Sequence, residues 1–154
     1  MNSDFAIALH ILGFLTSRGG GPLTSEEMAR LYGTNAVIIR RVQSKLNKAG
    51  LIETRRGVGG GSVLARDPED INLREAYEAV SPEPEILPRH PASCQQVVPI
   101  VVGQFVNEIC SDAEEALLRQ LESMTIKAMD RTIRSRIRKA LSAKRSARRR
   151  KAAS

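Results

Sequence analysis

The residues of this chain best suited to chemistry are arginines, and two of them are adjacent at Arg40 and Arg41. The predicted helix over 35–49 has one apolar face, formed by Ile39, Val42, Leu46 and Ala49. Its other face is polar and carries Arg40, Arg41, Gln43, Ser44, Lys45 and Lys48. An arginine can bond guanine through two hydrogen bonds, whereas a lysine mostly neutralises phosphate. The pattern is typical of a recognition helix in the DNA major groove, and a solvated amphipathic helix is the alternative.

A second pair of arginines precedes a glycine-rich turn. Arg55 and Arg56 are followed by Gly-Val-Gly-Gly-Gly over 57–61, between strands predicted at 51–54 and 62–65. Glycines let the backbone approach phosphates closely, and an arginine at such a tip can enter a narrow minor groove. A nucleotide-binding loop is the weaker interpretation, because the glycines lead into a strand and no Lys-Ser or Lys-Thr follows. A turn without a ligand is the third interpretation.

The sequence contains no grouping typical of an enzyme or a metal site. There is no Ser, His and Asp grouping with a second histidine in reach by sequence, and no spacing typical of metal ligands. Cys94 and His90 together cannot supply the four protein ligands that a [2Fe–2S] cluster needs. Cys94 can instead be a lone redox sensor, since a nearby helix start lowers a thiol pKa, or it can be an inert packed residue. We expect no cofactor and no metal.

Charge divides the chain into three segments. Residues 1–66 contain nine Lys or Arg and four Asp or Glu, a net charge of +5. Residues 67–130 contain four Lys or Arg and thirteen Asp or Glu, a net charge of −9. Residues 131–154 contain eleven Lys or Arg and no Asp or Glu, a net charge of +11. Basic segments favour polyanions such as nucleic acid, although charge also serves solubility alone.

Helix start signals divide the first part of the chain into short elements. Ser3 or Asp4 can cap a first helix that runs to about Ser17. Thr24 with Glu27 forms a capping box for a helix over 25–32. Asn72 with Glu75 forms another for a helix through Val80, and Thr34 or Asn35 caps the helix between them. Helix, helix, turn, helix and hairpin is the order of a winged helix-turn-helix domain.

A long helix is predicted over 97–123, with a near-heptad apolar seam. Such a helix is too long for a domain of this size unless a partner subunit covers the seam. We therefore expect a homodimer whose interface contains Val98, Val102, Phe105, Ile109, Leu117 and Leu121. Thr125 can cap a last short helix, and from Arg131 on the composition predicts disorder or at best a fraying helix.

Composition excludes several protein classes. The 154 residues suit one domain with an appendage, and no apolar run is long enough to cross a membrane. Two cysteines exclude a disulfide scaffold, and Asp4 stands where a signal peptide carries positive charge. The expected location is therefore cytoplasmic. Three Phe, two Tyr and no Trp are too few for an aromatic platform that stacks RNA bases.

The chain resembles the Rrf-two family of bacterial winged helix-turn-helix regulators over about residues 1–130. The segments that carry the resemblance are FAIALHIL (5–12), LTSEEMARLYGTN (23–35), VIIRRVQSKLNKAGLIETRRGVGGGSVLAR (37–66), INLREAYEAV (71–80) and the long helix after Cys94. The resemblance implies a dimer, formed mainly through the long helix, on a near-palindromic operator. It also implies that Arg40 and Arg41 meet the major groove and Arg56 the minor groove. Several family members bind an iron–sulfur cluster through three cysteines before the long helix, and here only Cys94 matches.

The fold class expected is mainly α with a small β wing, a winged helix-turn-helix domain plus a long dimerisation helix. The expected parts are a DNA-binding domain over 1–66, a connecting and dimerising part over 67–130 and a basic tail over 131–154. The DNA-contacting residues expected are Ser25, Asn35, Val37, Arg40, Arg41, Ser44, Lys45, Arg55, Arg56, Gly59 and Gly60. The function expected is a transcriptional regulator of double-stranded DNA, more specifically a repressor, with an unknown effector. The alternatives are a basic RNA- or ribosome-associated protein and a redox-sensing regulator using Cys94.

Overall fold

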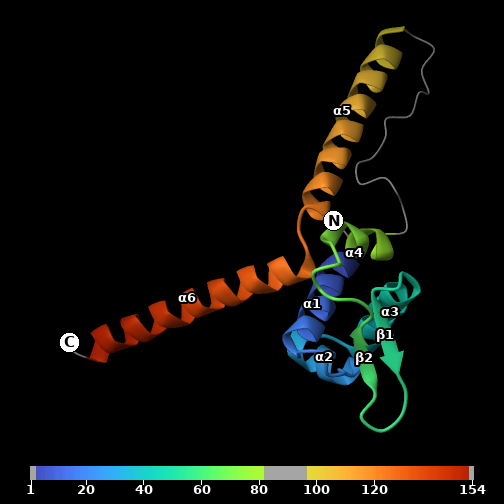
Figure 1. Ribbon diagram of the computed structural model, residues 1–154. Coiled ribbons are helices and arrows are strands. Elements are labelled where there is room, and N and C mark those ends of the chain that lie inside the picture. Colours follow the sequence, from blue (N-terminus) through green and yellow to red (C-terminus); the bar gives the residue numbers. More distant parts are fainter. Residues whose placement is uncertain (1–2, 82–96, 153–154) are drawn as a thin grey trace.

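A computed structural model of the chain describes residues 3–81 and 97–152 (Figure 1). It is mainly helical with one small sheet, as the sequence predicts. Its elements are α1 (Ser3–Ser17), α2 (Ser25–Tyr32), α3 (Ala36–Lys48), β1 (Ile52–Arg55), β2 (Gly61–Leu64), α4 (Leu73–Val80), α5 (Val97–Glu122) and α6 (Ile126–Ala152). The order from α1 to β2 is that of a winged helix-turn-helix domain.

Side-chain caps fix where the short helices begin. The Thr24 hydroxyl accepts from the Glu27 amide at 3.2 Å, and the Glu27 carboxylate accepts from the Thr24 amide at 2.9 Å. Asn72 and Glu75 form the same reciprocal pair at the start of α4. Asn35 caps α3 by accepting from the Val37 amide at 2.8 Å. Both predicted capping boxes are therefore confirmed.

The core surrounds α1, which packs against α3, α4 and α6. The buried apolar side chains of this core come from α1, α2, α3 and α4, from the segments beside these helices and from the first turn of α6. The fully buried larger ones include Ile11, Leu12, Leu15, Met28, Ile39, Val42, Leu46, Leu51, Ile52, Ile71, Val80 and Ile126. Because α1 touches both α3 and α6, it sets the position of the recognition helix and of the C-terminal helix together.

The wing is an antiparallel hairpin in which Ile52 pairs with Leu64 and Arg55 with Gly61. A backbone bridge ties it to the segment before α2: the Leu23 amide donates to the Ser62 carbonyl at 3.0 Å, and the Ser62 amide donates back at 2.8 Å. Gly61 has a φ of +146°, and a Cβ there would lie 2.7 Å from the Leu23 backbone. The base of the wing therefore requires glycine at this position.

The long helix α5 extends away from the domain (Figure 1). Most of its apolar side chains are exposed: Val98 is 72% exposed, Phe105 61% and Ile109 52%. Val102 and Leu117 are exposed as well. Leu121 differs, because α5 approaches α4 at this end and Leu121 packs against the chain's own core. Leu121 is therefore only partly available to a partner, and its place in the seam stays a prediction.

The C-terminal helix is longer than the sequence predicts. A short helix followed by disorder or fraying was expected from Arg131 on, but α6 continues to Ala152. Its first turn is held by burial of Ile126 and Met129, so the costly step of helix initiation is supported by the core. Alanine, lysine and arginine, which dominate the rest, then propagate a helix well.

The described residues, 3–81 and 97–152, include no helix that is long and apolar enough to span a membrane.

Candidate nucleic-acid interface

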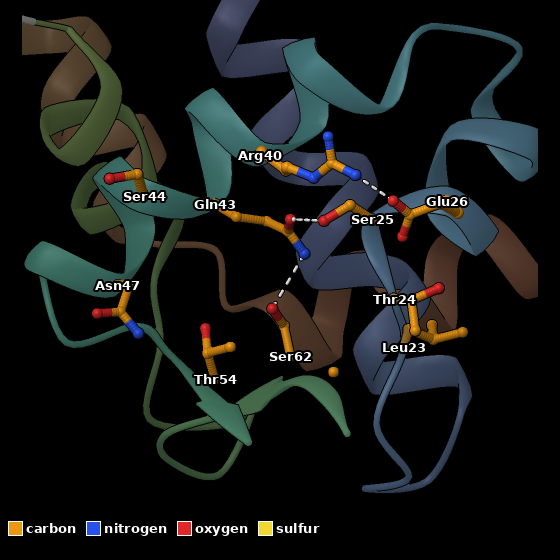
Figure 2. A pocket seen from close by; sticks show the side chains of 11 residues that line it. Leu23, Thr24, Ser25, Glu26, Arg40, Gln43, Ser44, Asn47, Thr54 and Ser62 are labelled. Atoms are coloured by element: carbon orange, nitrogen blue, oxygen red, sulfur yellow. Dashed lines mark hydrogen bonds and ion pairs between the residues drawn. The ribbon is translucent and has the colours of Figure 1, made fainter. Parts of the chain in front are cut away.

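The start of α2, the outer side of α3 and the wing enclose a groove of about 470 Å³ (Figure 2). Figure 2 shows Ser25 and Glu26 from α2 facing Arg40 and Gln43 from α3, with Ser62 of the wing beneath them. The residues that line the groove are Leu23, Thr24, Ser25, Glu26, Arg40, Gln43, Ser44, Asn47, Thr54, Gly61 and Ser62. Its walls therefore come from the two elements predicted to contact DNA and from α2.

The floor of this groove is a buried amide, Gln43, which is 7% exposed. Its Oε1 accepts from the Ser25 hydroxyl at 2.7 Å, and its Nε2 donates to the Ser62 hydroxyl at 3.0 Å (Figure 2). Nε2 also lies 3.5 Å from the Met28 sulfur. The prediction that Gln43 lies on the outer face of the helix is wrong. Gln43 lies at the edge of the apolar face, where the wing covers it, so it joins α2, α3 and β2.

The outer side of α3 presents Arg40, Ser44 and Val37, all exposed. Arg40 forms an ion pair with Glu26 of α2, and more than half of each side chain is in contact with solvent. Exposed pairs of this kind contribute about 0–1 kcal/mol to stability. The Arg40 guanidinium can therefore leave Glu26 for another acceptor at little cost.

Arg41 and Lys45 lie on the other edge of α3, where they pair with Asp4 of α1. The distances are 2.6 Å from Arg41 Nη2 to Asp4 Oδ1 and 2.8 Å from Lys45 Nζ to Asp4 Oδ2. Lys45 also donates to the Val80 carbonyl at 3.1 Å and is only one third exposed. Lys45, expected at the DNA, is thus directed toward α1 and α4, whereas the Arg41 side chain remains more than half exposed.

This pairing determines the ionisation of Asp4, which is 4% exposed. Burial by itself raises the pKa of the Asp4 carboxyl, but hydrogen bonds from Lys45 and Arg41, with their positive charges, outweigh it. The net effect is a pKa below the ordinary value for aspartate. Asp4 is therefore a charged tether between α1 and the recognition helix.

The wing exposes Arg55 and Arg56 at the end of β1 and the start of the turn. Neither forms an ion pair within the parts of the chain that the structure describes. Gly60 was expected at the DNA, but it is partly buried, and a Cβ there would lie 2.4 Å from the Arg55 carbonyl oxygen. Its close backbone contact explains a glycine here without a ligand. Gly59 is exposed, and a Cβ at this position would meet open space.

Two further arginines flank the wing, and neither was among the predicted DNA-contacting residues. Arg18 and Arg30 line a second groove with Gly57, Gly59 and Gly60 of the wing. Hydrogen bonds from Thr24, followed by the charges of Arg18 and Arg30, lower the pKa of the Glu27 carboxyl in this groove. The signal was available in the sequence, because both arginines adjoin turns at the ends of predicted helices.

Comparison with known proteins agrees with this geometry. Residues 1–131 match the protein family described as "Rrf2: Iron-dependent Transcriptional regulator". The chain belongs to the Rrf2 family. This confirms the resemblance, and the family's members are transcriptional regulators rather than enzymes.

Individual relatives extend along most of the chain. YwnA of Bacillus subtilis strain 168, named as an HTH-type transcriptional regulator, is 33% identical over 123 residues, 80% of this chain and 88% of YwnA. A transcriptional regulator from Lactobacillus plantarum has a similar structure, with a TM-score of 0.71, 21% identity and coverage of 87% of this chain and 91% of that one. CymR, the global cysteine regulator of B. subtilis, gives a TM-score of 0.62 at 19% identity, covering 86% and 96% of the two chains. The two structures support the fold.

The remaining sequence-predicted residues of this Rrf2 chain have structural partners or lie elsewhere. Ser25 bonds Gln43 and Asn35 caps α3, so both positions serve the fold whether or not they meet DNA. Cys94 and His90 lie outside the described residues. Cys110 is half-buried within α5. Within residues 3–81 and 97–152 no group of three or more His, Cys, Asp or Glu is placed to hold a metal ion.

The Gln43 bonds predict a stability effect. Gln43→Leu keeps the volume but leaves the Ser25 and Ser62 hydroxyls without their amide partner, which costs about 1–3 kcal/mol of unfolding free energy. Ser44→Ala, one residue along and exposed, is the matched control and should change stability by less than about 0.5 kcal/mol. Urea unfolding of both variants measures the difference. Equal unfolding free energies for Gln43→Leu and the control would contradict this role.

The Asp4 tether predicts a pH effect. Because its pKa is lower in the folded than in the unfolded chain, its stabilisation is present above about pH 4 and is lost as the pH falls through the folded pKa. Asp4→Asn should therefore lower stability at neutral pH by about 1–2 kcal/mol and flatten its decline below pH 4. Urea unfolding at several pH values measures this. A decline below pH 4 in Asp4→Asn as steep as that of the wild type would refute the assignment to Asp4.

Proposed function

We propose that this Rrf2-family chain is a cytoplasmic, homodimeric repressor that binds a near-palindromic operator in double-stranded DNA and occludes the promoter. The observation that best supports the proposal is the way in which α3 is held against the rest of the domain. Its buried face and both edges are fixed by Gln43 and by the Asp4 pairs, while Arg40 and Ser44 remain on the exposed side. A rigid helix with exposed donors is what base-edge recognition in the major groove requires.

Arg40 is the residue we assign to base recognition. Breaking the ion pair between Arg40 and Glu26 so that Arg40 can bind a guanine costs little free energy, because the ion pair is exposed. Glu26 also serves selectivity in this proposal, since its carboxylate lies beside the groove and repels phosphate. Arg40 therefore leaves Glu26 most readily where a base edge offers two acceptors. Arg41 keeps an exposed side chain and reaches the neighbouring phosphate or base of the DNA. Lys45 stays paired with Asp4.

The wing and its flanking arginines supply the second contact. Arg56 enters the minor groove beside the half-site, where a narrow groove concentrates negative potential. Arg55, Arg18 and Arg30 surround the turn and neutralise phosphates on either side of it. This division assigns sequence reading to α3 and positioning to the wing.

The exposed seam of α5 is the proposed dimer interface. Val98, Val102, Phe105 and Ile109 lie on one face of the helix and are all exposed in the single chain. A second copy related by a two-fold axis covers them and places two recognition helices for a two-fold symmetric operator. Leu117 adjoins this face, whereas Leu121 serves the chain's own core.

Iron, which the family description names, has a poor set of ligands here. A cluster held by cysteines takes four protein ligands, and the whole chain has two cysteines. We therefore derive no sensing step through a cluster. Purified protein is expected to be colourless, without visible absorbance or stoichiometric iron. A brown preparation with bound iron would contradict this expectation.

The two alternatives from the sequence gain no specific support. An RNA- or ribosome-associated role rests only on the basic tail, and 131–154 contains no aromatic residue for base stacking. A redox role rests on Cys94, outside the described residues.

Selection of bound duplexes from a random library, followed by footprinting and a promoter-reporter assay, tests the proposed function. Absence of any enriched sequence would refute it.

Arg40→Ala should cost about 1–3 kcal/mol on the selected operator and relax preference at one base position of each half-site. The physical reason is the loss of two hydrogen bonds to a base. Binding titrations with the operator and its single-base variants measure both effects. Arg30→Ala is the matched control, since removal of a cation that meets phosphate weakens all sequences about equally. If Arg40→Ala also weakens all sequences equally, Arg40 does not read bases.

Phe105→Glu should give a folded but largely monomeric chain with weak operator binding, because it places a carboxylate in an apolar interface. Sedimentation measures the mass, and circular dichroism checks that the helices persist. Glu108→Gln, on the same helix at an exposed position, is the control and should remain dimeric. An unchanged dimer in Phe105→Glu would show that this seam is not the interface.

A further inference from the structure

The helix α6 continues beyond the part of the chain that defines the family. The family match ends at residue 131, whereas α6 runs to Ala152. The sequence from Arg131 to the end carries eleven Lys or Arg and no Asp or Glu. The family match therefore does not cover this extension.

The extension is rigidly attached to the domain. In the first turn of α6, the Ile126 amide donates to the Ile71 carbonyl at 2.9 Å and the Lys127 amide to the Pro68 carbonyl at 3.0 Å. Asp130 is buried and accepts from the Ser17 hydroxyl of α1 at 3.0 Å. The direction in which α6 leaves the domain is thus fixed by α1 and by the segment before α4.

The first half of α6 turns isoleucines toward the domain. Ile133 and Ile137 line an apolar groove of about 410 Å³ together with Leu9 and Phe14 of α1. The apolar side of the first half of α6 is therefore turned toward the domain. All residues from 131 to 144 are exposed, so every basic side chain in this range is in contact with solvent.

Four of the six described cations of this extension, within residues 131–144, have no counter-charge among the described side chains. Arg131 pairs with Glu69 at 3.0 Å and Arg134 with Asp130 at 2.6 Å. Among the described side chains, Arg136, Arg138, Lys139 and Lys144 form no ion pair. The sequence continues with Arg145, Arg148, Arg149, Arg150 and Lys151. The acidic helix α5 and α6 leave the domain in different directions (Figure 1).

We propose that the α6 extension is a second, sequence-independent DNA-binding surface. A row of cations without carboxylates is complementary to a phosphate backbone, and each phosphate neutralised releases a counterion. A lipid surface fits less well, since a membrane-binding helix needs an apolar face free of its domain, and Ile133 and Ile137 line the groove against α1. The inference rests on the proposed function, because that function brings DNA to the chain.

The position of α6 limits which DNA it meets. α3 and the wing lie on one side of α1, and α6 projects away from them (Figure 1). The extension therefore does not share the half-site bound by its own recognition helix. It meets either the same duplex beyond that half-site or a second duplex, and the chemistry is the same in both cases.

The test replaces the four cations without ion pairs by a neutral helix former: Arg136→Gln, Arg138→Gln, Lys139→Gln and Lys144→Gln together. The matched control keeps every charge through Arg136→Lys, Arg138→Lys, Lys139→Arg and Lys144→Arg. Binding to a random-sequence duplex is measured by fluorescence anisotropy over a series of salt concentrations. Circular dichroism and sedimentation check that both variants keep their helices and their oligomeric state.

The slope of log K against log salt is expected to flatten by about 0.9 for each phosphate that the neutral variant leaves without a cation. Three such phosphates for each of two copies would flatten it by about 5. The charge-preserving control should keep the wild-type slope. A wild-type slope in the neutral variant overturns the proposal. So does weaker binding to phosphatidylserine vesicles with DNA binding unchanged, because the surface then serves a membrane.

Two further measurements distinguish failure of this inference from failure of the proposed function, and flanking DNA from a second duplex. The same measurement in an Arg40→Ala background removes operator reading, so a flattened slope there supports the extension even if no operator is found. Conversely, an operator preference that survives with an unchanged slope keeps the proposed function and refutes this inference. Co-precipitation of a labelled duplex with an immobilised one distinguishes binding of a second duplex from binding of flanking DNA.

Discussion

The Gln43 amide is the interaction on which the DNA-facing geometry depends. A buried amide is costly unless its donors and acceptor are bonded, and Gln43 meets that need only when Ser25 and Ser62 are both within reach. Those partners belong to α2 and to the wing, while Gln43 belongs to α3. The bonds therefore select one spacing among three elements that apolar packing alone leaves able to slide. Arg40 then faces the groove because its neighbour three residues along is fixed.

Asp4 does the same for the opposite edge of α3 through charge rather than neutral hydrogen bonds. Its pairs with Arg41 and Lys45 join α3 to α1, and Lys45 extends the link to the end of α4. α1 also holds the first turn of α6 through Ser17 and Asp130. The recognition helix and the basic extension are consequently oriented by one helix, and a shift of α1 moves both.

Local signals predicted much of this fold, and long-range pairing accounts for what they missed. The capping residues Thr24, Asn35 and Asn72 act within three residues along the chain, so their patterns in the sequence were sufficient. Gln43 and Lys45 looked like outward polar residues, because periodicity does not reveal a partner as distant as Ser62 or Asp4. The length of α6 was missed because its initiation depends on burial of Ile126 against the core.

The uneven charge of the chain gains a physical meaning from this arrangement. The first 66 residues carry +5 and contain the groove, whereas 67–130 carry −9 and contain α4 and α5. A duplex is attracted to the first part and repelled by the second, so the charge pattern orients the chain on DNA before any base is read. In the proposed dimer it also keeps the apolar seam of α5 away from the polyanion and available to a second copy. The +11 extension breaks this division, and in the proposed arrangement a phosphate backbone supplies its counter-charge.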